Sequence, residues 1–368
     1  MSTAGQPSAA GPAPRPAIGL TQRRADDDPG LRTVRLCLLG FGSVARAFCA
    51  LLAQQERVLA ERHGLRVLVT AAGTRQGSLL APQGMTPAAV LAAVGERPAP
   101  PQAARPADEL LSASRADVLV ELTVMEEDFA PVATGHIETA FGLGMDVVTA
   151  NKGPIAWNWR RVSAAAAAAG RRIRFESTVM DGLPVFSLLE LALPDCRLLG
   201  FEAVFNATTN YIVDAMGIGR SFDEALVHVQ AEGYAEADPA HDIDGWDAAC
   251  KAAALANVAM DAGITPADID KQTLRDVPLK RIAQARSNGN RLRLVTTVWR
   301  EESGRVRGHV RATELDIEHP LAPVGGESLG AILHTDLMAD IFVCEIAGLV
   351  PQTAYGVYAD LLNLCRIH

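Results

Sequence analysis

Val34-Arg-Leu-Cys-Leu-Leu-Gly40-Phe41-Gly42-Ser43-Val44-Ala45 is the stretch that decides the fold. Its first six residues are mostly apolar, which predicts a strand buried on both faces. Gly40 then permits a tight turn, and Gly42 lets the backbone approach a pyrophosphate that the N terminus of the next helix stabilises. Ala45 stands where a third glycine is usual, and it is small enough for close helix packing. The stretch predicts a dinucleotide site formed by Gly40, Phe41, Gly42, Ser43 and Val44; a structural turn without function is the alternative.

Strands and helices alternate through the first half of the chain. We expect a helix at 43–62, strands at 65–71, 117–122 and 146–149, and an irregular crossover at 81–107 with a short helix around 88–94. Such alternation over roughly 120 residues is typical of a Rossmann-type, doubly wound parallel sheet. The fold class is therefore α/β.

The pattern changes after Asn151 to that of a mixed α+β domain. We expect helices near 163–169, 245–262 and 353–364, a helix opened by the capping box Ser221-Phe-Asp-Glu224, and strands at 173–178, 198–206, 291–300 and 305–315. The predicted organisation is a disordered tail at 1–30, a dinucleotide-binding domain at 31–152 completed by 336–368, and a substrate-binding and dimerisation domain at 153–335.

Composition narrows the class of partner. The 368 residues carry a formal charge of -9, which disfavours a nucleic-acid or polybasic membrane surface and favours a small-molecule substrate. No apolar run reaches the roughly 18 residues of a membrane span. The six cysteines form no C-x-x-C pair, as expected in a reducing cytoplasm. A transit peptide is the competing interpretation of the first 30 residues, and Asp26-Asp27-Asp28 counts against it.

The end of the second predicted strand bears on the choice of cofactor. An NAD site usually presents a carboxylate there to the adenosine ribose, but this strand ends Ala72-Gly73-Thr74-Arg75. Thr74 and Arg75 could instead hold a 2′-phosphate, so NADP(H) is preferred over NAD(H). Arg75 as a solvated loop residue is the alternative.

Three polar stretches carry candidate chemistry: Thr149-Ala-Asn-Lys152-Gly-Pro154, Asn206-Ala-Thr-Thr-Asn-Tyr211, and Gly233 to Asp247 followed by Lys251. The first lies at the carboxyl end of a parallel strand, where open sheets bind ligands. The third holds five carboxylates within twelve residues. A solvated loop, a metal site and a pocket for a cationic substrate group all remain open.

Asp247 and Lys251 are four residues apart and share one face of a helix. Many of the surrounding residues are apolar, which predicts burial, and a buried lysine beside a carboxylate is a plausible proton donor. An ordinary surface ion pair is the alternative.

These three stretches, in this order, make the chain similar to the homoserine dehydrogenases, which interconvert L-aspartate 4-semialdehyde and L-homoserine with NAD(P)H. The resemblance extends over about residues 32–362. It implies that Lys251 donates the proton to the aldehyde oxygen and that Lys152 lines the nicotinamide and substrate site. It further assigns Glu236, Asp247, Asp242 and Thr209 to the substrate, and Thr123, Gly233 and Gly348 to the cofactor.

The resemblance also implies a monovalent-cation site for Na⁺ or K⁺ and a homodimer. The cation ligands would be Glu176, Val179, Asp181 and Leu183, although Met180-Asp181 replaces the family's small residues. The family's Gly-Pro-Gly-Ala-Gly turn is likewise replaced, by Glu345-Ile-Ala-Gly348-Leu349. Larger members continue into a regulatory ACT domain, for which the chain leaves no room, so we expect a short form.

Three alternatives to a homoserine dehydrogenase remain. A dehydrogenase of a specialised pathway, acting on another 2-amino aldehyde or alcohol, would explain the altered turn. A non-catalytic NADP-binding sensor would not need Lys251. A metal-dependent hydrolase would need further ligands, because His241 stands alone in its loop.

Overall fold

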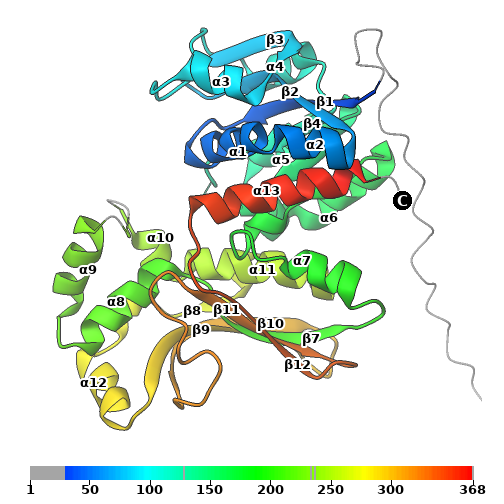
Figure 1. Cartoon of the computed structure of the whole chain (residues 1–368). Coiled ribbons are helices and arrows are strands. Elements are labelled where there is room, and N and C mark those ends of the chain that lie inside the picture. Colours follow the sequence, from blue (N-terminus) through cyan, green and yellow to red (C-terminus); the bar gives the residue numbers. More distant parts are fainter. Residues whose placement is uncertain (1–29, 127–128, 233, 236–237, 367–368) are drawn as a thin grey trace, which may run out of the picture.

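The computed structural model describes residues 30–126, 129–232, 234–235 and 238–366, and it contains two six-stranded sheets (Figure 1). One sheet lies above the other. Between them lie four helices: α6 (Lys152–Ala169), α7 (Val185–Ser187), α11 (Trp246–Met260) and α13 (Val350–Cys365). The predicted tail at 1–30 falls outside the described residues except for Gly30.

The first sheet has the order β3-β2-β1-β4-β5-β6. All its pairs are parallel except β2 with β3, which confirms the doubly wound fold. Its strands are β1 (Arg32–Leu39), β2 (Leu65–Gly73), β3 (Ser78–Met85), β4 (Val118–Glu121), β5 (Asp146–Thr149) and β6 (Ile173–Arg174).

Helices cover both faces of this sheet. Successive side chains of β1 point to opposite faces, and both sets are apolar, so each face packs against helices. Val34, Leu36 and Leu38 pack in one core with α1 (Ser43–Gln54), α3 (Pro87–Val94) and α13 (Val350–Cys365). Cys37 and Leu39 pack on the opposite face with α4 (Ala107–Ser114), α5 (Pro131–Gly142) and α6 (Lys152–Ala169). The C-terminal helix thus lies on the dinucleotide-binding sheet.

Three expectations for this half were wrong. The helix at 43–62 is broken at Gln55 (φ −93°, ψ 5°), and α2 (Glu56–His63) follows with Leu59 buried. The predicted irregular crossover at 81–107 begins inside strand β3. Pro82 and Gly84 usually interrupt strands, so the sequence did not predict this one, but an edge strand tolerates proline. The strand at 173–178 ends at Arg174, because the Glu176 backbone N–H donates to Asp360 and a 3₁₀ turn forms.

The second sheet has the order β12-β11-β7-β9-β10-β8 and is antiparallel except for β10 with β8. Its strands are β7 (Leu198–Val204), β8 (Asp270–Lys271), β9 (Arg291–Arg300), β10 (Val306–Leu315), β11 (Leu329–Thr335) and β12 (Asp340–Glu345). The predicted antiparallel strand pair is confirmed as β9 and β10. The mixed α+β character of this half is confirmed too.

Alanine-rich α11 (Trp246–Met260) packs against this sheet and against α6. Its small side chains, among them the fully buried Ala252 and Ala253, allow both neighbours to approach closely. The remaining helices are α7 (Val185–Ser187), α8 (Ala207–Gly217), α9 (Phe222–Ala231), α10 (Ala240–Ile243) and α12 (Leu279–Ser287). The capping box of α9, Ser221 with Glu224, is confirmed.

Within the described part of the chain, no helix is both long and apolar enough to cross a membrane. All six cysteines are free thiols.

Candidate active site

The glycine turn lies between β1 and α1, and its geometry requires glycine. Gly40 has φ +87°, and a Cβ there would lie 2.3 Å from the Leu122 carbonyl oxygen at the end of β4. Gly42 caps α1, and a Cβ there would meet no atom within 4 Å, so the space before the helix N terminus is open. The Phe41 side chain is buried between these two glycines. The turn therefore fits the pyrophosphate of a dinucleotide.

The turn after β2 lies where the adenosine ribose is expected. The Thr74 hydroxyl accepts hydrogen bonds from the backbone N–H groups of Gln76 (3.2 Å) and Gly77 (3.1 Å), so it closes this turn. Arg75 is exposed beside it. The turn, Gly73 to Gly77, thus carries an exposed arginine and contains no carboxylate.

A buried polar network connects the ends of β4 and β5. The Thr123 hydroxyl donates to Glu121, and Asn151 Nδ2 donates to the Thr123 carbonyl over 3.2 Å. Asn151 Oδ1 in turn accepts from Gly153 N–H at 3.0 Å and caps α6. This network fixes Thr123 beside the first turn of α6, which carries Lys152. Glu121 was not among the predicted site residues; besides Thr123, its partners are Thr149 at the end of β5 and His136 on α5.

Asp247 lies between the two lysines predicted to carry the chemistry. Its Oδ1 lies 2.8 Å from Lys152 Nζ and its Oδ2 lies 3.4 Å from Lys251 Nζ. Lys251 Nζ also donates to the Phe205 carbonyl at 2.7 Å. The side chains of Lys152, Lys251 and Asp247 are only 21%, 15% and 11% exposed. The fold therefore brings together residues from the first and third polar stretches as a buried cluster.

Asn206, from the second stretch, completes this cluster. Its Nδ2 donates to Asp242 Oδ1 at 2.8 Å and to Asp247 Oδ2 at 3.0 Å. Its Oδ1 accepts from Thr209 N–H at 2.8 Å and caps α8. The Thr209 hydroxyl donates to the Asn206 carbonyl and is buried. Asn206 was not among the predicted site residues, although its N-cap position was a usable signal.

Electrostatics keeps the cluster charged. Burial opposes ionisation of Asp247, but Lys152 and Lys251 outweigh it and hold the pKa of this carboxyl well below its usual range. Burial alone would lower the pKa of Lys152, but Asp247 reverses the effect and raises it. Burial and then the charge of Asp247 raise the pKa of Asp242. Lys152 is therefore an ammonium paired with a carboxylate at neutral pH.

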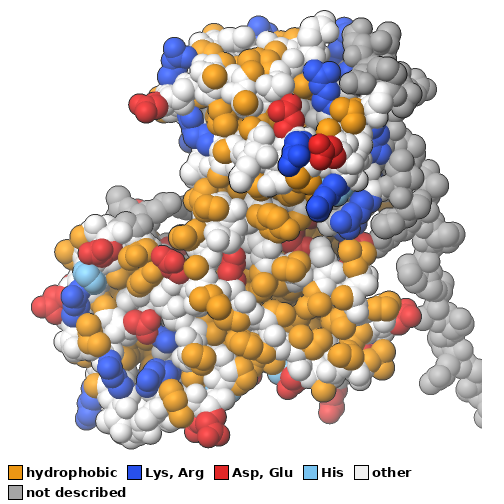
Figure 2. All heavy atoms as spheres, in the orientation of Figure 1, with side chains coloured by type: hydrophobic (Ala, Val, Ile, Leu, Met, Phe, Trp, Pro, Cys, Tyr) orange, Lys and Arg blue, Asp and Glu red, His pale blue; other side chains and the backbone are white. Residues whose placement is uncertain are grey.

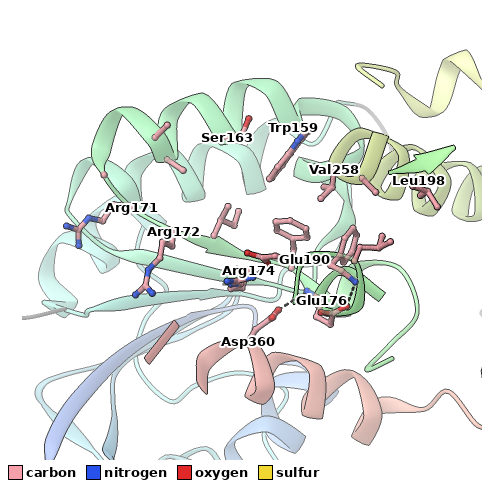
Figure 3. A pocket seen from close by; sticks show the side chains of 18 of the residues that line it. Trp159, Ser163, Arg171, Arg172, Arg174, Glu176, Glu190, Leu198, Val258 and Asp360 are labelled. Carbon is pink, nitrogen blue, oxygen red and sulfur yellow. Dashed lines mark hydrogen bonds and ion pairs between the residues drawn. The ribbon is translucent and has the colours of Figure 1, made fainter. Parts of the chain in front are cut away.

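The segment predicted to hold a cation borders a separate cavity of about 640 Å³ (Figure 3). Glu176 lines this cavity, and its carboxylate accepts from the backbone N–H groups of Phe186 (2.7 Å) and Ser187 (2.9 Å). Burial raises the pKa of Glu176, and it raises that of neighbouring Asp360 to about 8. The described residues contain no cluster of three or more His, Cys, Asp or Glu side chains placed to hold a metal.

The other predicted site residues are placed as follows. Gly233 and Glu236 lie outside the described residues. Gly348 follows β12, and a Cβ there would lie 2.3 Å from Asp181 Oδ2. Val179 is buried, and Leu183 lies in the next turn, its carbonyl accepting from Val185 N–H at 2.8 Å.

Comparison with known proteins agrees with this geometry. The family model for the NAD-binding domain of homoserine dehydrogenase matches residues 40–176, and the model for homoserine dehydrogenase itself matches 184–362. An NAD(+)-dependent homoserine dehydrogenase of Pseudomonas canavaninivorans is 29% identical over 336 residues, which cover 90% of this chain and 96% of the relative.

Solved structures agree as well. Homoserine dehydrogenase from Thermoplasma acidophilum has a TM-score of 0.78 at 25% identity, covering 90% of this chain and 99% of that one. A hyperthermophilic archaeal homoserine dehydrogenase in complex with NADPH has a TM-score of 0.76 at 26% identity, covering 90% and 98%. The chain belongs to the homoserine dehydrogenase family of nicotinamide-dependent oxidoreductases.

Proposed function

We propose that the protein reduces L-aspartate 4-semialdehyde to L-homoserine with NAD(P)H, in threonine and methionine biosynthesis, and that Lys251 donates the proton. The observation that carries this proposal is the buried cluster in which Asp247 lies between Lys152 and Lys251. Hydride addition leaves negative charge on the former aldehyde oxygen, and an ammonium held nearby can stabilise and protonate it.

The two lysines are held differently, which supports different roles. Lys152 makes the shorter contact to Asp247, at 2.8 Å, and is suited to orienting the substrate. Lys251 is fixed by the Phe205 carbonyl at 2.7 Å and by a longer contact to Asp247, at 3.4 Å. An ammonium has three N–H donors, so one donor of Lys251 is available to a substrate oxygen.

The substrate amino acid needs a carboxylate for its ammonium and a cation for its carboxylate. Asp242 and Asp247, joined through Asn206, are placed for the ammonium, with Glu236 proposed by resemblance alone. Lys152 is the cation available within the cluster. Thr209, whose hydroxyl is bonded to the backbone, would contribute by placing Asn206.

The cofactor, which supplies the hydride, would be held by residues from four segments. The pyrophosphate would bind to Gly40, Gly42, Ser43 and Val44, and the nicotinamide ribose to Thr123. The opposite side of the cofactor would contact Gly233 and Gly348. Exposed Arg75 beside Thr74 favours NADP(H). The Pseudomonas relative is named as NAD(+)-dependent and an archaeal structure holds NADPH, so either cofactor occurs among relatives.

The test is turnover of aspartate semialdehyde with NADPH and with NADH, compared between the native chain and Lys251→Ala. We expect the variant to bind NADPH normally and to lose turnover by at least about 10²-fold. Unchanged turnover would refute the role of Lys251. Normal binding by a native chain without any turnover would indicate the sensor instead.

A second candidate function rests on the replaced C-terminal turn, where Glu345 stands in place of the family's glycine. A dehydrogenase of a specialised pathway, acting on another 2-amino aldehyde or alcohol, would use the same lysines. Faster turnover of a longer or substituted analogue than of aspartate semialdehyde would favour this alternative.

We also propose a homodimer formed through the second sheet. The domain boundaries predicted at 152 and 336 shift to follow the sheets, because β6 (Ile173–Arg174) pairs in the first sheet and β12 (Asp340–Glu345) in the second. Figure 2 shows hydrophobic side chains gathered over this part of the molecule, and Leu199, Trp299 and Phe342 are exposed on its strands. Exposed apolar patches often mark protein interfaces. Sedimentation velocity would test the dimer.

Six free thiols agree with the cytoplasmic location that we propose.

A bound Na⁺ or K⁺ remains a proposal by resemblance. Glu176, Val179, Asp181 and Leu183 belong to one continuous segment, in which backbone carbonyls rather than side chains would coordinate the ion. Dialysis against tetramethylammonium, followed by a thermal melt with NaCl or KCl, would test this site.

A further inference from the structure

The turn between β12 and α13 carries two buried side-chain oxygens for which the described residues supply no donor. Glu345 Oε2, at the end of β12, and Gln352 Oε1, in the first turn of α13, both lack a hydrogen-bond partner among the residues that the structure describes. Both residues line one cavity of about 330 Å³, together with Gly182, Leu183, Pro184, Pro351 and Tyr355. Because an unpaired buried oxygen is energetically costly, these acceptors indicate a group that arrives with a ligand.

Asp181 brings a second carboxylate to this turn. Its Oδ2 lies against Gly348, where a Cβ would come within 2.3 Å, and its Oδ1 accepts from the Thr353 hydroxyl at 3.2 Å. Asp181 has φ +44°, in the left-handed region that few non-glycine residues adopt. The loop therefore holds this carboxylate in place at a conformational cost, as is frequent at binding sites.

Asp181 lies against Gly348, one of the residues proposed to hold the cofactor. Burial and the charge of Asp181 raise the pKa of Glu345 to about 7, and the charge of Lys251 acts in the opposite direction. Glu345 ends a strand of the second sheet, whereas α13, which follows the turn, packs on the first. The turn thus crosses from the second sheet to the sheet that carries the dinucleotide turn.

The proposed reaction involves two positive charges that such a pair could match: the ammonium of the amino acid and the oxidised nicotinamide ring. The proposed function already gives the ammonium to Asp242 and Asp247, which Asn206 joins. Resting on the proposed function, we infer that Asp181 and Glu345 lie beside the nicotinamide ring and stabilise its oxidised, cationic form. They determine which redox form of the cofactor binds more tightly.

This placement separates the charges of the reaction between two sides of the site. Lys251 stabilises the negative charge that develops on the aldehyde oxygen, and the two carboxylates stabilise the positive charge that the ring acquires as the hydride leaves. The reduced ring is neutral and gains little from the pair. Glu345 would therefore favour reduction of the bound aldehyde and slow release of the oxidised cofactor.

The experiment measures the dissociation constants of NADP⁺ and NADPH, and of NAD⁺ and NADH, by calorimetry without substrate. Glu345→Gln and Asp181→Asn keep side-chain size and remove one charge each. We expect each to weaken binding of the oxidised form at least about fivefold and to change binding of the reduced form less than twofold. Asp340→Asn, an exposed acid on the same strand, should change neither constant.

Equal weakening of both redox forms, or no change in either, would overturn the inference. A raised KM for aspartate semialdehyde would also overturn it if the ratio of the dissociation constants for the oxidised and reduced cofactor stayed unchanged, because the carboxylates would then bind the substrate. The proposed function fails separately, if the native chain shows no turnover of the semialdehyde while its cofactor ratio still responds to Glu345→Gln.

Discussion

Two regions of the molecule, the lysine cluster and the C-terminal turn, differ in how completely their polar groups are paired. In the lysine cluster, Asp247 and Asn206 have protein partners on both side-chain atoms. In the C-terminal turn, Glu345 Oε2 and Gln352 Oε1 have none among the described residues. A paired cluster is rigid before the substrate arrives, whereas an unpaired one depends on a ligand to complete it. We therefore expect removal of a charge to reduce stability and activity in the first region, and to change only the relative affinity for the two redox forms of the cofactor in the second.

The largest effect is expected from Asp247→Asn, which breaks the paired cluster. It leaves Lys152 and Lys251 buried without a full counter-charge, and removing one partner of a buried pair typically costs about 3–5 kcal/mol of stability. We expect kcat/KM to fall by at least about 10³-fold as both ammonium groups move. Urea unfolding and steady-state kinetics measure the two effects.

Asp261→Asn is the matched control, because Asp261 is an exposed residue that ends the same helix, α11. Its φ of +46° suits asparagine, so stability should change by less than about 0.5 kcal/mol and kinetics should stay native. If Asp247→Asn behaves like this control, the cluster does not have the importance assigned to it.

A smaller effect is expected from Asn206, which connects the cluster to α8. Asn206→Ala removes the donor to Asp242 and Asp247 together with the N-cap of α8, and should cost about 1–2 kcal/mol of unfolding free energy. We also expect KM for the semialdehyde to rise about tenfold, because Asp242 loses its fixed position. Asn206→Asp keeps a capping oxygen but removes the donor.

The two variants together separate structure from binding. Asn206→Asp should keep the helix cap, because aspartate caps helices well, but recover neither the full stability nor the KM, because it adds a buried carboxylate beside Asp242 and Asp247. Recovery of both properties would show that Asn206 acts only as a helix cap.

The same contrast explains what the sequence could and could not predict. The Gly40 turn, the capping box at Ser221 and the β9–β10 strand pair have local patterns, and all three were predictable. β3 was not, because Pro82 and Gly84 are breakers whose effect an edge position cancels. The N-cap of α8 is a local signal for Asn206, but its bonds to Asp242 and Asp247 join residues 36 and 41 positions apart, and no local pattern reports such contacts.

The resemblance brought Lys152, Asp247 and Lys251 into one site before any geometry was known, and the contacts agree with that grouping. It could not do so for Glu345, where the sequence departs from the family's glycine-rich turn. The family has no equivalent of Glu345 at this position, so no role could be transferred to it. Its environment had to come from the fold, through its burial and its missing partner.

The smallest expected effect is a pH dependence that sharpens the contrast. The pKa of Glu345 is raised from 4.5 to about 7, so the carboxyl is largely neutral at pH 6 and charged at pH 8. Between these values the native chain should bind NADP⁺ about threefold to tenfold more tightly relative to NADPH, because the carboxylate that favours the cationic ring appears only as the proton leaves. Asp181 and Lys251, the charges that act on Glu345, remain present in Glu345→Gln, so this variant isolates the titrating group. Calorimetry at pH 6, 7 and 8 should give a flat ratio for Glu345→Gln, and an equal slope in both proteins would assign the titration to another group.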